Sequence, residues 1–212
     1  MAAKTIAPHT LKLHDLKTRF KLQKSEAADF FLEWRDQSVL LTESEHGVLD
    51  RLKRNYLYLL EYPVMESIVK IVVLSPILDL AGFYEPPIRV EGEASIQVSA
   101  EDKGEIIQGS IDVLVVQEML WVTVIEAKNS EFSITKAIPQ TLAYMLSNPR
   151  VHRPCFGLVV NGSEFLFLKL QITNGIPKYA TSNLFSMLNE GNDLDRVLQI
   201  LKYFQTIIVE GI

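Results

Sequence analysis

The stretch GSIDVLVVQEMLWVTVIEAKNS, Gly109 to Ser130, reads as two apolar strands joined by a short turn. It also carries two carboxylates and an ammonium group, Asp112, Glu126 and Lys128, where strand alternation predicts apolar side chains. Charged groups at the centre of a predicted sheet need a chemical explanation, because burying an unpaired charge is strongly unfavourable.

The pairing of the two predicted strands would bring the two carboxylates close together. A turn centred on Met119 would pair Val116 with Val122 and would set Asp112 directly opposite Glu126. Like charges opposed across a ladder destabilise a sheet, so a shared proton, a bound cation or a different register must relieve the repulsion. We favour a divalent metal held by both carboxylates. Oxygen ligands without a nearby His or Cys suit Mg²⁺ or Mn²⁺ rather than zinc.

A simpler interpretation competes with the metal site. Asp112 could mark the frayed start of a strand, and Glu126 with Lys128 could form a solvated strand end. That is the usual explanation for a single acidic residue beside a strand. Here three charged residues converge on one predicted face, which favours the functional interpretation.

The composition predicts one α/β or α+β unit with a well-filled core. The chain has 212 residues, a net charge of -5 and 48% hydrophobic residues. Its single cysteine, Cys155, excludes an intramolecular disulfide, and the first residues lack the pattern of a secretory signal. We therefore expect a cytoplasmic protein. No apolar run is long enough to predict a membrane span.

The acidic balance gives no overall attraction to nucleic acid, so DNA binding would need a local basic patch. Two basic clusters are candidates, KTRFKLQK at residues 17–24 and RLKR at residues 51–54. Both are also compatible with ordinary solvated helix faces. The sequence leaves this choice open.

Hydrophobic periodicity predicts two helices before the strand-rich region. The first covers residues 42–62, where Thr42 and Glu45 stand at capping-box spacing. Its apolar stripe repeats every three to four residues, at Leu49, Leu52, Tyr56 and Leu59 or Leu60. The second begins at about Pro63 and is kinked near Pro76. Its predicted apolar stripe consists of Val64, Ile68, Ile71 and Val72.

The later elements are predicted as three strands, a helix, a hairpin and a final helix. They cover residues 88–99, 105–117, 120–128, 133–148, 155–170 and 192–210. Asn161 and Gly162 form the expected hairpin turn. The order αβββαββα from residue 63 predicts an α/β fold with a central mixed sheet flanked by helices. An additional helical segment precedes it.

The predicted helix at 133–148 carries polar residues on one face. Lys136, Gln140 and Tyr144 are spaced four apart, so they share one side of a helix. A cation, an amide and a phenol suit hydrogen bonding to a phosphate and to an attacking water. An exposed polar stripe on any surface helix has the same pattern.

Together these motifs resemble the PD-(D/E)XK nuclease superfamily, and more narrowly the N-terminal nuclease domain of type I restriction enzyme R subunits. The resemblance covers about residues 63–170. It is carried by IDVLVV at 111–116, IEAK at 125–128, the Gln140 and Tyr144 helix, ESIVKIVVLSPILDLAGF at 66–83 and GLVVNGSEFLFLKL at 157–170. Ile111 stands where the superfamily's name has proline, and residues 1–60 have no recognised counterpart.

The resemblance implies a restriction-endonuclease-like fold and metal-dependent hydrolysis of phosphodiester bonds in DNA. Asp112 and Glu126 would hold Mg²⁺ or Mn²⁺, with the Ala127 carbonyl as a further ligand. Lys128 would orient the attacking water and stabilise charge developing on the phosphate.

Two further residues receive roles from the resemblance. Gln140 would position the substrate or the active-site lysine. Glu66, on the leading helix, would be an additional acidic ligand or a base. A solvated carboxylate at a helix start explains Glu66 equally well.

The sequence alone does not decide which partners the protein has or whether it cleaves nucleic acid. No GxxxxGK[ST] loop occurs, so the chain has no motor of its own, and a separate motor or specificity subunit is an expected partner beside DNA. The alternatives are a non-cleaving nucleic-acid-binding or assembly module that retains the fold, and a homodimer formed through the helical ends of the chain. We expect a mainly helical extension at residues 1–62 and a nuclease-like domain at residues 63–212.

Overall fold

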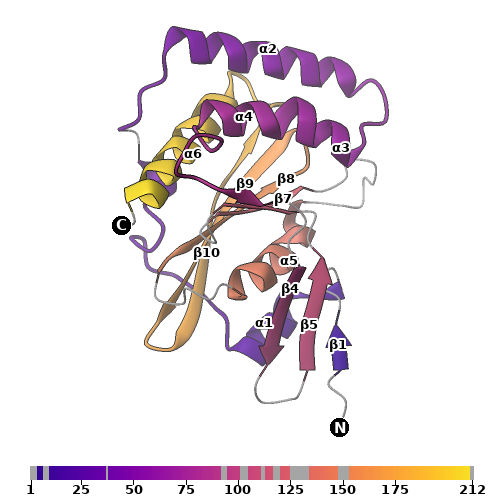
Figure 1. Ribbon diagram of the computed structural model, residues 1–212, viewed down its shortest axis with the longest axis vertical. Coiled ribbons are helices and arrows are strands. Elements are labelled where there is room, and N and C mark those ends of the chain that lie inside the picture. Colours follow the sequence, from indigo (N-terminus) through magenta and orange to yellow (C-terminus); the bar gives the residue numbers. More distant parts are fainter. Residues whose placement is uncertain are drawn as a thin grey trace.

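The chain has an α/β architecture in which a mixed sheet is flanked by helices on both faces (Figure 1). The computed structural model describes residues 4–6, 10–36, 38–91, 95–100, 105–110, 113–116, 120–124, 134–147 and 153–210. Within these ranges no helix is long and apolar enough to cross a membrane.

Ten strands and six α-helices are present in the described ranges. The strands are β1 (Lys4–Ile6), β2 (Gln23–Lys24), β3 (Val90–Glu91), β4 (Ser95–Ala100), β5 (Glu105–Ser110), β6 (Val113–Val116), β7 (Leu120–Val124), β8 (Cys155–Val160), β9 (Glu164–Thr173) and β10 (Ile176–Ser186). The helices are α1 (Leu13–Phe20), α2 (Glu43–Leu59), α3 (Glu66–Val69), α4 (Ser75–Leu80), α5 (Ile134–Leu146) and α6 (Asp193–Glu210).

The main sheet has seven strands in the order β2-β10-β9-β8-β7-β6-β3. β7 and β8 are parallel, as are β2 and β10, and the other neighbours are antiparallel. The parallel β7 and β8 are connected through α5, as a parallel pair requires a crossover. A second sheet, in the order β1-β5-β4, lies apart from the first and close to α1 and α5 (Figure 1).

Two of the expected strands are wrong as single elements. The segment predicted at 88–99 is divided into β3 and β4, and the segment predicted at 105–117 is divided into β5 and β6. In each case the first and second parts belong to different sheets. Alternating apolar residues identify the buried face of a strand, but they do not identify the strand with which it pairs.

The helix α2 confirms the first helical prediction. Thr42 is its N-cap, and its side chain accepts a hydrogen bond from the Glu45 backbone nitrogen at 3.3 Å. The Glu45 carboxylate in turn accepts from the Thr42 backbone nitrogen at 2.7 Å, which completes the capping box. Leu49, Leu52 and Tyr56 are buried, as the spacing predicts.

The second predicted helix is confirmed, but its apolar stripe is wrong. A π-helical turn at Lys70–Leu74 separates α3 from α4. There the Ser75 backbone nitrogen bonds to the Lys70 carbonyl, five residues back. Of the predicted stripe only Val64 is buried; the buried residues on this helix are Val69, Val73, Leu74, Ile77 and Leu78. Ile68 and Ile71 are exposed and Val72 is half-buried.

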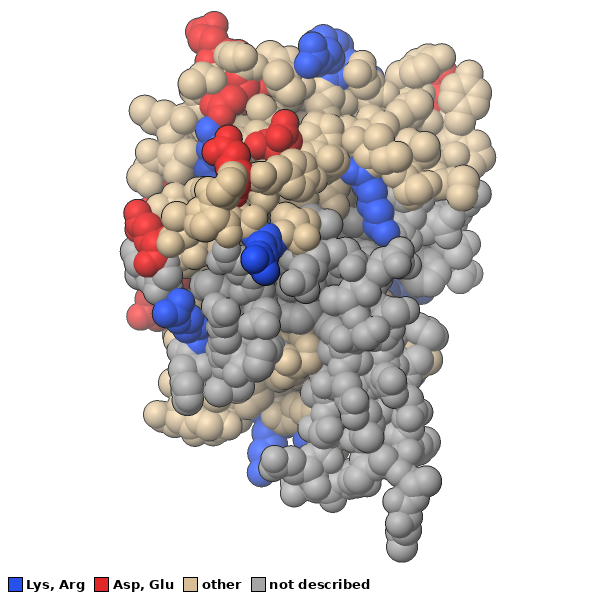
Figure 2. All heavy atoms as spheres, viewed as in Figure 1, with Lys and Arg blue, Asp and Glu red and all other residues tan. Residues whose placement is uncertain are grey.

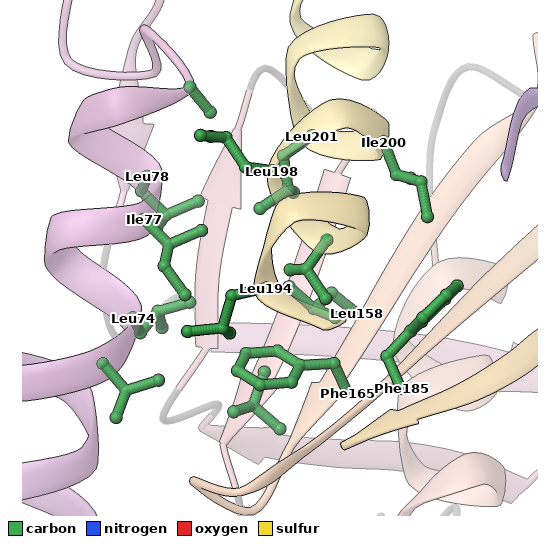
Figure 3. Packing of buried hydrophobic residues seen from close by; sticks show 14 of the residues in the cluster. Leu74, Ile77, Leu78, Leu158, Phe165, Phe185, Leu194, Leu198, Ile200 and Leu201 are labelled. Carbon is green, nitrogen blue, oxygen red and sulfur yellow. The ribbon is translucent and has the colours of Figure 1, made fainter. Parts of the chain in front are cut away.

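Two hydrophobic clusters lie on opposite faces of the sheet, because alternate residues of β8 and β9 point to opposite sides. On one face Phe156, Leu158 and Phe167 pack with residues of α2, α4 and α6. On the other face Val159 and Leu168 pack with α1 and α5. Figure 3 shows the first cluster, with side chains of α4 meeting those of α6 above Leu158 and Phe165 of the sheet.

The expected register between the strands of the opening stretch is also wrong. Val116 pairs with Leu120 rather than with Val122, and Leu114 pairs with Val122. The connection is therefore shorter by two residues than a turn centred on Met119 requires. Turn geometry sets the register of a hairpin, and the apolar pattern alone allows both alternatives.

Residues of the N-terminal part enter the same cores as the rest of the chain. Phe31, Leu49 and Tyr56 belong to the first cluster, and Leu16 and Leu22 belong to the second. The strand β2 adds to the edge of the main sheet beside β10. The division at residue 62 stays a prediction, but the described part of the extension is packed onto the sheet from both sides.

Candidate functional site

The four residues predicted at the centre of the site, Asp112, Glu126, Ala127 and Lys128, lie outside the described residues. Their neighbours in the sequence are placed: β6 begins at Val113, and β7 ends at Val124. The observed β6–β7 register gives no support to the argument that set Asp112 directly opposite Glu126. The metal site therefore depends on the resemblance and on the chemistry of the residues.

The end of β7 lies beside the end of β8. The two strands run parallel, and Val124 pairs with Val160. The chain then turns at Gly162 and Ser163, and the Asn161 backbone nitrogen donates to the Glu164 carbonyl at 3.3 Å. This confirms the predicted hairpin between β8 and β9.

Helix α2 covers this hairpin turn. Gly162 has a φ of +101°, and a Cβ built there would lie 1.8 Å from the Tyr56 hydroxyl oxygen. Only glycine permits both that backbone conformation and that close approach. The contact ties α2 to the end of the sheet at which β7 and β8 both finish.

Helix α5 packs closely against β8, and this packing sets the position of Gln140. A Cβ at Gly157 of β8 would lie 2.8 Å from Met145 Sδ and 3.1 Å from Thr141 Cγ2. Both contacts are tighter than ordinary van der Waals distances, so Gly157 lets the helix approach the strand. Thr141 is fully buried and donates its hydroxyl hydrogen to the Ala137 carbonyl at 3.0 Å.

The predicted polar stripe of α5 is only partly exposed. Lys136 is exposed, Gln140 is half-buried, and Tyr144 is 2% exposed. The Gln140 side-chain amide nitrogen donates a hydrogen bond to the Tyr144 hydroxyl at 2.8 Å. The ordinary solvated helix face that the sequence left open therefore does not describe Gln140 and Tyr144. A hydrogen-bonded amide next to a buried phenol has a fixed orientation, which a positioning role requires.

Glu66 is the first residue of α3. Among the described residues no group of three or more His, Cys, Asp or Glu side chains could hold a metal ion. The predicted donor set of Asp112, Glu126 and the Ala127 carbonyl offers oxygen atoms only. This donor chemistry suits Mg²⁺ or Mn²⁺.

The sequence prediction assigned Tyr56 to the apolar stripe of α2 and missed its hydroxyl. That oxygen is buried and has no hydrogen-bond partner among the described residues. Burial raises the pKa of Tyr56 to about 12. The helical spacing predicts that the ring is buried, but it does not show that the hydroxyl lies against the turn at Gly162.

The two basic clusters occupy different places. Lys17 on α1, Lys21 just after that helix and Lys24 on β2 are exposed, at the end of the sheet where β8 begins. Arg51 and Arg54 are exposed on α2, which lies at the end where β8 finishes. The α2 cluster is therefore the one at the same end as the carboxyl terminus of β7.

No protein-family model matches the chain, and a search of curated proteins found no significant match.

Proposed function

We propose that this protein is a metal-dependent nuclease that hydrolyses phosphodiester bonds in DNA. The observation that supports this most directly is the Gln140–Tyr144 pair, held in a half-buried position on the helix that follows β7. The resemblance expects such a glutamine beside the strand that carries the Glu-x-Lys motif. A merely solvated helix face would leave both side chains exposed.

The strand arrangement is a second support for the proposal. β3, β6, β7 and β8 are neighbours in the main sheet, and β6 is antiparallel to the other three. The α3–α4 segment precedes them in the chain, and α5 lies between β7 and β8. This αβββαβ arrangement of helices and strands agrees with a restriction-endonuclease-like core. We therefore extend the observed α/β fold to that finer class as part of the proposal.

The chemistry follows from the residue types at the proposed site. A divalent metal held by the carboxylates of Asp112 and Glu126 would polarise a phosphate and lower the pKa of a bound water. The Lys128 ammonium would stabilise negative charge that develops on the phosphate oxygens. Gln140, fixed by Tyr144, would orient the lysine or the substrate. Glu66 stays a candidate further ligand.

The decisive experiment measures cleavage of supercoiled plasmid and of single-stranded DNA with Mg²⁺ or Mn²⁺. Asp112→Ala and Lys128→Ala are expected to lower the rate about a hundredfold or more, because each removes a group that acts on the reacting phosphate. Gln140→Ala is expected to lower the rate less, through positioning. Lys136→Ala is the matched control, because it changes an exposed residue of the same helix.

Each result has a definite meaning. Metal-dependent cutting that survives in Asp112→Ala and Lys128→Ala would contradict the proposed site. If the wild-type chain binds Mn²⁺ but cuts neither substrate, a separate motor or specificity subunit becomes the next component to add. If Mn²⁺ gives no thermal stabilisation, the non-cleaving binding or assembly module replaces the nuclease.

A further inference from the structure

The outward face of α2 carries a set of residues that the fold does not use. Leu49, Leu52 and Tyr56 are buried on the opposite side of this helix. At 100° per residue, the exposed positions 47, 51, 54, 55 and 58 fall on one face, and Tyr62 lies close to Tyr58 just beyond the helix end. We call this set the α2 stripe: Gly47, Arg51, Arg54, Asn55, Tyr58 and Tyr62.

The two tyrosines of the α2 stripe are open to solvent. Tyr58 is 61% exposed and Tyr62 is 60% exposed. Their ring centroids lie 6.3 Å apart with an interplanar angle of 68°, an edge-to-face pair. Two adjacent aromatic rings on a surface offer faces on which flat unpaired bases can stack.

The arginines of the α2 stripe supply positive charge next to these rings. Arg51 and Arg54 are exposed, and neither forms an ion pair with a described residue. The neighbouring Lys53 is used by the fold instead, since its ammonium donates to the carbonyls of Asn189 and Gly191. Guanidinium groups without a carboxylate partner suit contacts with phosphate oxygens.

Two of the three acidic residues of α2 are engaged by contacts within the fold, whereas the exposed Glu43 lies at the N-terminal end of the same face as the stripe. Asp50 accepts a hydrogen bond from the Asn192 side-chain nitrogen at 2.8 Å, and Glu45 pairs with Lys202. Figure 2 shows acidic atoms over the N-terminal end of α2, basic atoms over its middle, and a mainly uncharged surface with a small acidic spot toward its C-terminal end. The positive charge of the stripe is therefore limited to its middle, where Arg51 and Arg54 lie beside the aromatic pair, and the exposed Glu43 and Glu61 flank it at the two ends.

No packing contact within the fold explains why residue 47 is a glycine. It is exposed inside α2, and a Cβ built there meets no atom within 4 Å. Glycine weakens a helix at such a position, so alanine would be the more stable choice. A missing side chain does allow a bulky polymer backbone to approach the helix closely.

We propose that the α2 stripe binds single-stranded nucleic acid, with Arg51 and Arg54 on phosphates and Tyr58 and Tyr62 stacked on bases. A single strand fits better than a duplex because paired bases do not present their faces to a protein surface. The stripe belongs to the helix that covers the turn after β8, at the end of the sheet where β7 finishes. The inference deepens the proposed nuclease function and rests on it for the class of substrate.

The test is fluorescence anisotropy of a labelled oligothymidylate and of a labelled duplex, with EDTA present so that no metal-dependent cleavage occurs. The double variant Tyr58→Ala/Tyr62→Ala is expected to bind the single strand about tenfold more weakly or worse, while Tyr58→Phe/Tyr62→Phe keeps the wild-type affinity. Arg51→Gln/Arg54→Gln is expected to reduce the slope of log K against log salt concentration by about 1.4, the value for two lost phosphate contacts.

Lys17→Gln/Lys24→Gln is the matched charge control, because it removes two exposed cations from another surface. Equal loss of affinity in that control and in the arginine variant would overturn the proposal in favour of unspecific attraction. So would a wild-type chain that binds no single strand, or that prefers the duplex. Light scattering in which the tyrosine variant alone loses a dimeric mass would assign the stripe to a second copy of the chain instead.

Circular dichroism at the same temperature establishes that each variant is folded. The results also separate this inference from the proposed function. Stripe-dependent binding by a chain that neither cleaves DNA nor is stabilised by Mn²⁺ would support the inference and contradict the nuclease, whereas metal-dependent cleavage with a dispensable stripe would do the reverse.

Discussion

Tyr56 is the residue whose ionisation most directly reports on the fold. Its hydroxyl is fully buried, and no described residue bonds to it. Burial raises its pKa in the folded chain to about 12, from the ordinary 10.0 of an exposed tyrosine. The unfolded chain therefore loses this proton at a lower pH than the folded chain, so the contribution to stability is complete below pH 10 and falls as the pH rises toward 12.

This difference predicts an alkaline loss of stability that depends on one side chain. Between about pH 8 and pH 11 the free energy of unfolding should fall by about 1.4 kcal/mol through Tyr56. Urea unfolding of the wild type and of Tyr56→Phe at both values measures it, since other tyrosines and lysines contribute equally to both proteins. At neutral pH Tyr56→Phe should be neutral or slightly stabilising, because the hydroxyl has no partner to lose. Identical pH profiles for the two proteins would contradict the burial of this hydroxyl.

At the scale of elements, the segment before α2 is held to β9 by an ion pair. Lys169 is 8% exposed, its ammonium pairs with the Glu33 carboxylate, and it lies 5.5 Å from the ring centroid of Phe30. Farther along this segment, the Arg196 guanidinium of α6 donates to the Trp34 carbonyl at 2.8 Å. These contacts dock residues 30–35 onto the sheet and α6 together.

Breaking the Lys169–Glu33 pair from one side should therefore be costly. Lys169→Met leaves a largely buried carboxylate without its cation and should lower the free energy of unfolding by about 3 kcal/mol, while Glu33→Leu/Lys169→Met should recover most of the loss. Lys202→Met is the control, because Lys202 is more exposed than Lys169 and its partner Glu45 keeps hydrogen bonds from Thr42, so the loss should be about 1 kcal/mol. Denaturant unfolding of the four proteins gives the comparison. Equal losses in Lys169→Met and Lys202→Met would mean that the Thr42 hydrogen bonds do not compensate Glu45 for its lost cation.

Local chemistry explains which elements could be predicted from the sequence. The capping box at Thr42 and Glu45 and the spacing of Leu49, Leu52 and Tyr56 act within one helix, so α2 was predicted correctly. The stripe of the next helix was wrong because it was counted from Val64, which lies before the first helical residue, Glu66, and because the π-helical turn at Lys70–Leu74 inserts a residue into the helical repeat. The strand β10 was not predicted, since Pro177 and Asn183 interrupt its apolar pattern and its buried positions do not alternate regularly.

The candidate site shows the same division between local and long-range information. The four-residue spacing of Lys136, Gln140 and Tyr144 correctly predicted that they share a helix. Gln140 is half-buried and Tyr144 is buried because α5 approaches β8 closely at Gly157. That glycine comes from a distant part of the chain. The register of β6 and β7 likewise depends on a turn whose length the apolar pattern does not determine.

For the whole molecule, the question is whether the N-terminal extension is a separate unit. The aromatic residues Phe31, Phe156 and Phe204 form a stack with centroid distances of 4.1 to 6.5 Å, and only Phe31 comes from the extension. Leu49 and Leu52 of α2 are also buried in that cluster. Each buried apolar side chain of this kind contributes about 1.5 to 3 kcal/mol, and whole domains are stable by only about 5 to 15 kcal/mol.

Removing the extension should therefore abolish cooperative folding of the remainder. A chain of residues 63–212 would expose the faces of α4, α6 and the sheet that now contact Phe31, Leu49 and Tyr56. We expect it to be rapidly degraded by limited proteolysis and to show no cooperative thermal transition by circular dichroism, whereas a chain lacking only residues 1–3, which keeps β1 and its pairing with β5, should keep the transition of the full protein. A cooperative transition in the 63–212 chain would instead establish the boundary at residue 62 as a true domain boundary. Helix α2, which covers the turn at Gly162, would then be separable from the domain. In that case single-strand binding by α2 would belong to a separable element, because the helix could then leave the sheet without unfolding it.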